Sequence, residues 1–437
     1  MTRVNWPFLR TDNPTIVGAE GIYLLAADGS RIMDAAGGAI VANVGHGRER
    51  VAARVAQVTR DCTYVVPPWI TPSRQALAET LNRDWLPPGL GRIHITSGGS
   101  EAVEAAMKMA LQYQAAIGQP QRQKIMARSV SYHGTTVATT ALSGHPARKR
   151  GLEHALQAYP RAPTPYPLRC PLGPHHPEAG RFYVDALRQA VEAEGADQVA
   201  ALIAEPITGS SGGALVPPDD YWPAVRALCD EYGMLLVMDE VMTGFGRTGT
   251  RFAYQHWDIE PDILVAGKGL AGGYAPIGGV YANERVGSAI QAAGMSVMFH
   301  TFGAHPAACA AAVEVLNILT EEDLVARAAR QGALLKERLA DAFEDHPHVA
   351  EVRGQGLLAA IEVVADRDTL APYPEAAGVS NRIIGAALKR GVFFYFGGTG
   401  EVRDIVCMGP PFIIEAGHID TMVGVLRDAV DEVTACP

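Results

Sequence analysis

From about residue 92 to residue 279, short apolar runs alternate with stretches of helical periodicity. The runs cover residues 93–96, 124–127, 199–204, 234–238 and 263–266. Apolar strands that alternate with helices are typical of a mostly parallel sheet with helices on both faces. In such sheets, ligands bind beyond the carboxyl ends of the strands. Residues that directly follow these runs are therefore the first candidates for chemistry.

The pattern changes after about residue 320. It predicts an amphipathic helix over residues 321–344 and a closing helix over 419–433. Between them it predicts a strand over 356–364, a helix over 379–390 and a strand over 392–396. Together these elements indicate a smaller α+β unit.

The start of the chain also contains strand-like segments. Residues 21–25 and 31–34 are strand-like, and Asp28-Gly29 between them is a hairpin turn signal. We expect the two ends to pack together. The sequence thus predicts an α/β chain in which residues 61–319 form a large domain, while residues 1–60 and 320–437 form a small one.

Composition and charge exclude several classes of protein. The chain has 437 residues, of which 48% are hydrophobic and 19% charged, as in a globular enzyme. Lys and Arg number 37 against 47 Asp and Glu, so no basic stripe is expected to bind nucleic acid. No apolar run approaches the roughly 18 residues of a membrane span, and residues 1–10 lack the apolar segment of a secretory signal. The six cysteines contain no CxxC pair, which indicates reduced thiols and a cytoplasmic protein.

Four motifs suggest other functions but lack the context that each function requires. Residues 244–249 match GxGxxG, yet no helical periodicity follows to receive a dinucleotide. Ser211 lies in a GxSxG match, but no helix follows to complete the elbow of a serine hydrolase. Residues 235–240 resemble the acidic strand of an ATPase, although no phosphate-binding loop is present. His175 and His176 have no further spaced ligands, so no metal site is expected.

Lys268 differs from the other five lysines. It follows the apolar run 263–266 and enters the glycine-rich segment 269–279, with no carboxylate nearby in the sequence. A lysine nucleophile must be neutral, whereas its ordinary pKa is about 10.4. Burial without an anionic partner favours the neutral form. These features predict a lysine that forms a Schiff base, and the alternative is a buried lysine whose amine reaches the surface.

Two further segments fit the same chemistry. Asp239 ends the run 234–238, where a carboxylate can keep a pyridine nitrogen protonated as pyridoxal phosphate requires. Residues 97–102 form a turn of small residues that opens a predicted helix, and such a turn presents free N–H groups to a phosphate. The lysine, the aspartate and the turn together indicate a pyridoxal-phosphate enzyme.

These residues resemble the class III (subgroup II) pyridoxal-phosphate-dependent aminotransferases, in particular the ω-amino-acid and amine:pyruvate transaminases. The motifs that carry the resemblance are TSGGSEA at 96–102, YHG at 132–134, AEP at 204–206, MDEV at 238–241, GFGRTG at 244–249, GKG at 267–269, HTFG at 300–303 and GPP at 409–411. The resemblance implies fold type I, with a mostly parallel seven-stranded sheet, and a homodimer whose active sites are shared between subunits.

The resemblance also implies a role for each matching residue. Lys268 would carry the cofactor and move the substrate proton, and Asp239 would pair with the ring nitrogen. The other implied cofactor contacts are Tyr132 and Val241 on the two ring faces, His133 beside Tyr132, Glu205 near the ring hydroxyl, Gly99 and Ser100 at the phosphate, and Thr301 from the neighbouring subunit. An amine would give its amino group to the cofactor, and a keto acid, expected to be pyruvate, would then receive it.

The substrate side departs from part of the family pattern. Members that act on α-amino acids or ornithine carry an arginine three residues before Pro410, where this chain has Cys407. Arg403 is the candidate for a mobile arginine that binds the keto-acid carboxylate, with a solvated loop arginine as the alternative. Trp69 is a candidate for the amine pocket or for interface core. Ala39 and Ile40 lie where some relatives carry bulkier pocket residues, which suggests a roomier pocket.

Other activities remain open on the same residues. An aminomutase or racemase would use the same cofactor set, and an α- or ω-amino-acid:2-oxoglutarate aminotransferase would differ only in its acceptor. A regulatory protein that binds the cofactor without turnover is disfavoured because Lys268 and Asp239 are both present. A serine hydrolase based on Ser211 would act independently of the cofactor.

Overall fold

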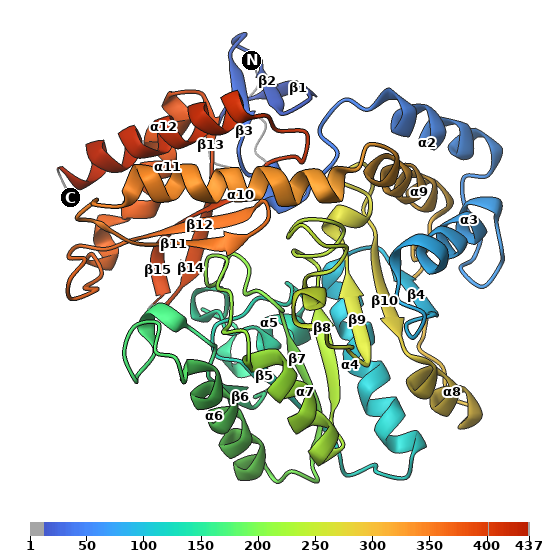
Figure 1. Cartoon of the computed structure of the whole chain (residues 1–437). Coiled ribbons are helices and arrows are strands. Elements are labelled where there is room, and N and C mark those ends of the chain that lie inside the picture. Colours follow the sequence, from blue (N-terminus) through green and yellow to red (C-terminus); the bar gives the residue numbers. More distant parts are fainter. Residues whose placement is uncertain (1–12, 401, 436–437) are drawn as a thin grey trace.

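The computed structural model describes residues 13–400 and 402–435. Its centre is a seven-stranded sheet in the order β4-β10-β9-β8-β7-β5-β6 (Figure 1). The strands are β4 (Arg92–Thr96), β5 (Lys124–Arg128), β6 (Arg161–Ala162), β7 (Val199–Ala204), β8 (Leu235–Asp239), β9 (Ile263–Ala266) and β10 (Gly278–Ala282). β10 pairs antiparallel with both β4 and β9, and the other pairings are parallel. The predicted mostly parallel sheet is confirmed.

Both faces of this sheet are buried, which explains why its central strands are apolar throughout. In β8, Leu235 and Val237 pack in one apolar cluster with helix α4 (Gly99–Ala116), while Leu236 and Met238 belong to a second cluster on the other face. The remaining helices of this unit are α5 (Val137–Leu142), α6 (Ala179–Glu194), α7 (Tyr221–Tyr232) and α8 (Glu284–Ala292). The helices hold the strand ends in fixed positions.

The two ends of the chain form two smaller four-stranded sheets. One contains β1 (Ile16–Glu20), β2 (Tyr23–Ala26), β3 (Arg31–Asp34) and β13 (Val392–Phe393), and the other contains β11 (Val349–Gln355), β12 (Leu358–Val363), β14 (Tyr395–Thr399) and β15 (Val402–Met408). The predicted strand 392–396 is therefore wrong as a single element. Phe394 is fully buried between β13 and β14, and the chain passes there from one sheet to the other.

Helices α10 (Leu324–Phe343), α11 (Val379–Lys389) and α12 (Ala416–Thr434) cover the small sheets, as Figure 1 shows in orange and red. Two stretches of the chain connect the small and the large unit. The first, between β3 and β4, contains α1 (Gly37–Ile40), α2 (Glu49–Asp61), α3 (Pro72–Thr80) and the π-helical turn Leu81–Trp85, and the second, before α10, contains α9 (Pro306–Glu321). Short 3-10 turns are η2 (Pro146–Arg148), η3 (Glu153–Ala155), η4 (Pro167–Arg169), η5 (Ala253–Trp257), η6 (Lys268–Leu270) and η7 (Glu375–Ala377). The strand pairing of β3 with β13 confirms that the chain ends pack together; the exact domain boundaries stay a prediction.

A buried ionic cluster joins β11 and β12 to the central unit. Arg353 forms an ion pair with Glu362 at 2.6 Å, and it donates to the carbonyl oxygens of Gly212 and Gly213 at 2.8 and 2.6 Å. The Tyr166 hydroxyl also donates to Glu362. Because Gly212 and Gly213 follow β7, this cluster fixes the small sheet relative to the strand ends that carry the site.

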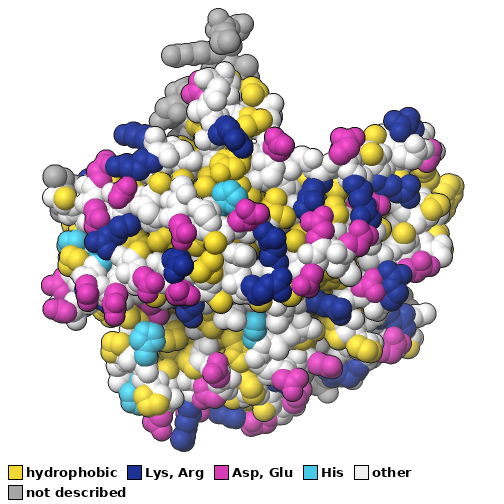
Figure 2. Space-filling model, turned by 45° about the horizontal axis from the view of Figure 1, so that its top comes forward, with side chains coloured by type: hydrophobic (Ala, Val, Ile, Leu, Met, Phe, Trp, Pro, Cys, Tyr) yellow, Lys and Arg dark blue, Asp and Glu magenta, His cyan; other side chains and the backbone are white. Residues whose placement is uncertain are grey.

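The surface carries both signs of charge. On the face drawn in Figure 2, Lys and Arg side chains are interspersed with Asp and Glu side chains. Arg48 pairs with Glu322 at 2.8 Å and Arg50 with Glu314 at 2.6 Å, which ties α2 to the region of α9. Among the helices formed by residues 13–400 and 402–435, none has the length and apolar character of a membrane span.

Candidate active site

A cavity of about 180 Å³ lies at the carboxyl ends of the central strands. Four strand ends and one helix N-terminus contribute its lining, as expected for a sheet of this type. The lining residues are Gly99, Ser100, Tyr132, His133, Gly134, Glu205, Ile207, Asp239, Val241, Met242, Thr243 and Lys268. The structure thus brings together eight residues that the sequence singled out from separate motifs.

Lys268 enters this cavity directly after β9. Its φ of 33° lies in the left-handed region, which is uncommon for a residue with a side chain and occurs where the surroundings impose it. Burial lowers the pKa of Lys268 to about 8, opposed by the charges of Asp239 and Glu205. No carboxylate lies near Lys268 in the sequence, but parallel strands bring Asp239 and Glu205 to the same sheet edge as the lysine. Burial still prevails, and the amine is neutral in a useful fraction near neutral pH.

Asp239 is held by two contacts at the end of β8. One carboxylate oxygen lies 2.7 Å from His133 Nδ1, and the other accepts a hydrogen bond from the Val241 N–H at 3.1 Å. His133 is itself buried, and its Nε2 has no hydrogen-bond partner among the described residues. The aspartate is therefore oriented from behind while its cavity side stays available.

Glu205, after β7, is a second buried carboxyl group. It accepts hydrogen bonds from the Gly209 N–H at 2.9 Å and the Tyr132 N–H at 3.2 Å. Burial raises the pKa of Glu205, while the charges of His133 and Arg128 oppose the rise. The hydrogen bond from the Tyr132 N–H places the backbone that carries the aromatic ring beside the glutamate.

The N-terminus of α4 closes the cavity with very small residues. A side chain at Gly99 would place its Cβ 2.9 Å from Val241 Cγ1, and one at Gly134 would meet Ser100 Oγ at 2.6 Å. Gly98, the N-cap, offers no side chain to the first N–H groups of the helix. An N-terminus with free N–H groups favours an anion such as phosphate.

The cavity fits pyridoxal phosphate on these observations. An amine with a lowered pKa, a buried aspartate on the same edge and a glycine-lined helix N-terminus match the aldehyde, ring nitrogen and phosphate of that cofactor. Among the described residues, no group of three or more His, Cys, Asp or Glu side chains is arranged to hold a metal ion. Ser211 Oγ is buried and has no hydrogen-bond partner in the described chain, so no base accompanies it as a hydrolase would require.

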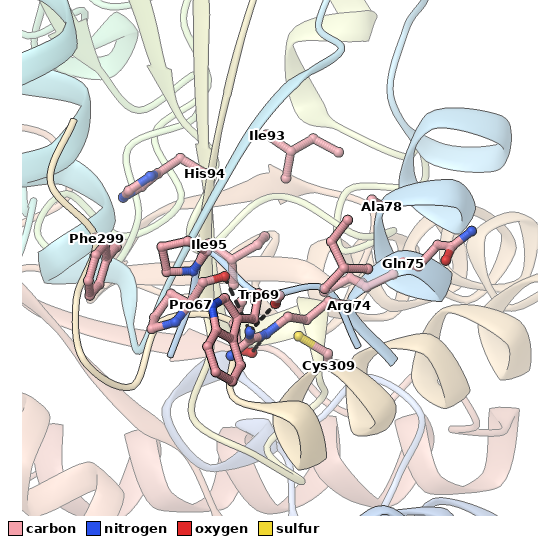
Figure 3. A pocket seen from close by; sticks show the side chains of 14 residues that line it. Pro67, Trp69, Arg74, Gln75, Ala78, Ile93, His94, Ile95, Phe299 and Cys309 are labelled. Atoms are coloured by element: carbon pink, nitrogen blue, oxygen red, sulfur yellow. Dashed lines mark hydrogen bonds between the residues drawn. The ribbon is translucent and has the colours of Figure 1, made fainter. Parts of the chain in front are cut away.

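Five residues proposed from sequence lie outside this cavity. Thr301 is exposed, and its carbonyl oxygen accepts a hydrogen bond from the Tyr64 hydroxyl at 3.0 Å. Trp69 is 67% exposed and lines a separate, apolar cavity of about 590 Å³ (Figure 3). Ala39 is exposed, whereas Ile40 is buried against Gly409. Their roles stay predictions for this protomer.

Arg403 also lies away from the cavity lining. Its guanidinium donates to the Tyr373 carbonyl oxygen, at 2.9 Å from Nη2 and 3.3 Å from Nε. The sequence did not single out four lining residues, Gly134, Ile207, Met242 and Thr243, each of which lies within a few residues of a predicted site residue. A second omission is Arg148, which lies over the ring of Tyr132. Its position in a long loop gave no periodic signal by which to place it.

Comparison with known proteins gives consistent matches over nearly the whole chain. A family model described as aminotransferase class-III matches residues 10–430. Putrescine–pyruvate aminotransferase of Pseudomonas aeruginosa is 31% identical over 96% of this chain and 91% of its own. Diaminobutyrate–2-oxoglutarate transaminase of Halomonas elongata is 32% identical over 98% and 92%, respectively.

Two solved structures show the same arrangement. A thermostable (S)-enantioselective ω-transaminase from Thermomicrobium roseum superposes with a TM-score of 0.92 and 33% identity, covering 98% of this chain and 96% of that one. The ω-transaminase of Pseudomonas jessenii in complex with PMP gives a TM-score of 0.91 and 32% identity over the same shares.

The lowered pKa of Lys268 leads to a test on the protein freed of cofactor. Because only the neutral amine is nucleophilic, its rate of covalent coupling to pyridoxal phosphate should rise with pH and level off above about 8. Stopped-flow absorbance between pH 6 and pH 10 measures this rate, and a simple lysine derivative with a pKa of about 10.4 serves as the reference. A protein rate that parallels the reference up to pH 10 would contradict the burial argument.

Proposed function

Because the chain belongs to the class III aminotransferase family, whose members use pyridoxal phosphate, we propose that it moves an amino group from an amine or ω-amino acid to pyruvate. The observation that carries this proposal is the convergence of Lys268, Asp239 and the α4 N-terminus on one cavity. The two half-reactions would alternate on the same site in a ping-pong sequence. The chain is an enzyme of the transaminase class.

Each group in the cavity has a proposed task. Bound pyridoxal phosphate supplies an electron sink for the charge left on the substrate carbon. The Lys268 amine removes the proton from that carbon and returns it, since its pKa of about 8 suits both directions near neutral pH. Asp239, oriented by His133, would hold the proton on the ring nitrogen. Tyr132 and Val241 would enclose the ring, and Gly99 and Ser100 with the α4 N–H groups would hold the phosphate.

The proposed keto-acid acceptor follows from Cys407 on β15 of the small unit. Cys407 is buried, and burial raises the pKa of its thiol to about 12, so it stays neutral and offers no cation to a carboxylate. The arginine that the resemblance places here in enzymes of α-amino acids is thus absent. This favours an amine:pyruvate activity, and 2-oxoglutarate, the acceptor named for the Halomonas elongata relative, is the second candidate.

A second copy of the chain would complete the site. Large apolar side chains are exposed on one face: Trp69 at 67%, Ile70 at 81%, Met298 at 66% and Phe302 at 63%. Arg74 ties this face together, because it donates to the carbonyl oxygens of Trp69 and Ala304, as Figure 3 shows in part. Exposed apolar patches of this kind mark protein interfaces. Thr301 lies on this face rather than in its own cavity, which supports a homodimer in which it reaches the partner's cofactor.

The reducing cytoplasm is the proposed location. All five cysteines in the described part of the chain are free thiols, and four of them are buried. Buried free thiols are compatible with a reducing compartment and do not require disulfides for stability.

The proposed function is tested with a panel of amine donors, with pyruvate or 2-oxoglutarate as acceptor, followed by the absorbance of the cofactor. We expect amine-dependent bleaching of the cofactor that pyruvate reverses. Lys268→Ala should lower turnover by at least roughly 10²- to 10⁴-fold, the contribution of one positioned acid–base group. Products formed without any keto acid would instead indicate an aminomutase or racemase. A borohydride-reducible link between Lys268→Ala protein and cofactor would overturn the lysine assignment.

Shared sites are tested by complementation between chains. A heterodimer of Lys268→Ala and Thr301→Ala chains should contain one site with both changes and one site with neither. Activity at limiting cofactor should therefore exceed that of either variant homodimer, because one site binds the cofactor normally. The matched control pairs wild type with the double variant Lys268→Ala/Thr301→Ala, in which every site has one change. Equal activity in the two heterodimers, or a fully active monomer, would refute sharing through Thr301.

A further inference from the structure

A cation stands at the mouth of the cavity and has no role in the chemistry described above. Arg148 ends the short turn η2, in the loop that follows α5. Its guanidinium carbon lies 4.7 Å from the centroid of the Tyr132 ring, and Tyr132 lines the cavity. A guanidinium over an aromatic ring is held by cation–π attraction, so the charge is kept beside the cavity without a carboxylate partner.

The charge of Arg148 reaches both sides of the mouth. It contributes to lowering the pKa of Lys268 on the large unit, and it opposes the burial that raises the pKa of Tyr395 on β14. Tyr395 is paired with Cys407 across the β14–β15 ladder. Arg148 is therefore close enough to β14, the strand paired with the one that carries Cys407, for its charge to act there.

Arg148 differs from the other arginines around the site because its donors are not in use. Arg353 is bound to Glu362, Arg247 donates to backbone carbonyls, and Arg403 donates to Tyr373. Within residues 13–400 and 402–435, the Arg148 guanidinium has no ion pair with a carboxylate and no hydrogen bond, and Arg148 is exposed. A guanidinium in this state presents the planar fork that binds a carboxylate through two parallel hydrogen bonds.

We propose that Arg148 is the specificity-determining cation that binds the carboxylate of acid substrates, a role that rests on the proposed transaminase function. The cavity holds only about 180 Å³, less than the roughly 300–1,000 Å³ of typical ligand sites. Bound cofactor would occupy this cavity, and a substrate that reacts beside it would extend toward Tyr132, over whose ring the Arg148 guanidinium lies. Arg148, on the large unit, thus takes the place of the arginine that enzymes of α-amino acids carry on β15, where this chain has Cys407.

This assignment separates two kinds of substrate. A carboxylate gains charge-assisted hydrogen bonds from Arg148, whereas an amine without an acid group packs on Tyr132 and needs no cation. Acid substrates come from two sources: the keto-acid acceptor, whose carboxylate adjoins the carbonyl, and an ω-amino acid, whose carboxylate lies at the far end. Both present the same chemistry to the guanidinium.

The experiment measures the two half-reactions separately in the holoenzyme. The variants are Arg148→Ala, Arg148→Lys and the matched control Arg150→Ala, which removes an exposed arginine from the same loop. The substrates are pyruvate, 4-aminobutanoate and 1-phenylethylamine. Arg148→Ala should raise the apparent dissociation constant of at least one of the two acids roughly 10- to 100-fold, as expected for lost charge-assisted hydrogen bonds. The value for 1-phenylethylamine should change less than about threefold, and Arg148→Lys should recover part of the loss.

A binding measurement without turnover accompanies the kinetics. Calorimetric titration of the holoenzyme with 3-phenylpropanoate, an unreactive carboxylate, should show weakened binding in Arg148→Ala and unchanged binding in Arg150→Ala. The affinity of wild type should also fall with added salt, because the guanidinium is exposed.

The outcomes distinguish the proposal from the function on which it rests. A wild-type protein that transfers no amino group from any donor refutes the function, while the titration still reports on Arg148. An active wild type in which Arg148→Ala affects acids and 1-phenylethylamine equally overturns the proposal. So does a selective loss for acids in Arg403→Ala that Arg148→Ala does not share. A loss for pyruvate alone, for 4-aminobutanoate alone, or for both supports the proposal and identifies the carboxylate that Arg148 binds.

Discussion

The burial of one amine at the end of β9 is the constraint on which the site depends. Lys268 has a positive φ and lies among closely packed backbone segments, so its side chain stays in the cavity rather than reaching solvent. The energetic cost of burying the charged form lowers its pKa to about 8. The strands around Lys268 are buried on both faces in a closely packed core, and this packing stabilises the fold despite the cost of the buried amine.

Charged side chains lie at different distances from the cavity around the Lys268 amine. Asp239 and His133 lie behind the cavity, Glu205 lies beside it with Arg128 donating to its backbone carbonyl, and Arg148 lies at the mouth. Burial holds the pKa of Lys268 down, the charges of Arg247 and Arg148 add to this effect, and the charges of Asp239 and Glu205 oppose it. In the proposed reaction, the Asp239 carboxylate would lie near the ring nitrogen of the cofactor and the Arg148 guanidinium near the acid group of a substrate.

Local sequence patterns were sufficient to predict a site residue where its position depends on the end of one strand or the start of one helix. Lys268 and Asp239 follow apolar runs, and Gly99 and Ser100 open a helix, so their convergence at one sheet edge follows from the fold class. Contacts between loops were not accessible in this way. Arg148 belongs to a loop whose course depends on packing against Tyr132, and Arg403 turned toward Tyr373 through a contact with no sequence signature.

The passage of the chain from one small sheet to the other at Phe394 was also not predictable from local sequence patterns. An apolar run predicts one strand, but its first part pairs with β3, which lies far away in sequence, and its second part pairs with β15, which follows after a short turn. Phe394, buried between the two parts, marks where the first pairing ends. The 67% exposure of Trp69 likewise could not be predicted from the sequence pattern, and it supports the proposed homodimer.

In the proposed reaction, Asp239, a carboxylate fixed at a strand end, acts together with Lys268 during proton removal. The most direct measurement is single-turnover deamination of 1-phenylethylamine by Asp239→Asn holoenzyme, compared with wild type by stopped-flow absorbance. The asparagine keeps the shape but cannot hold a proton on the ring nitrogen, so the account predicts a rate lower by roughly three orders of magnitude or more. A rate within about tenfold of wild type would contradict it.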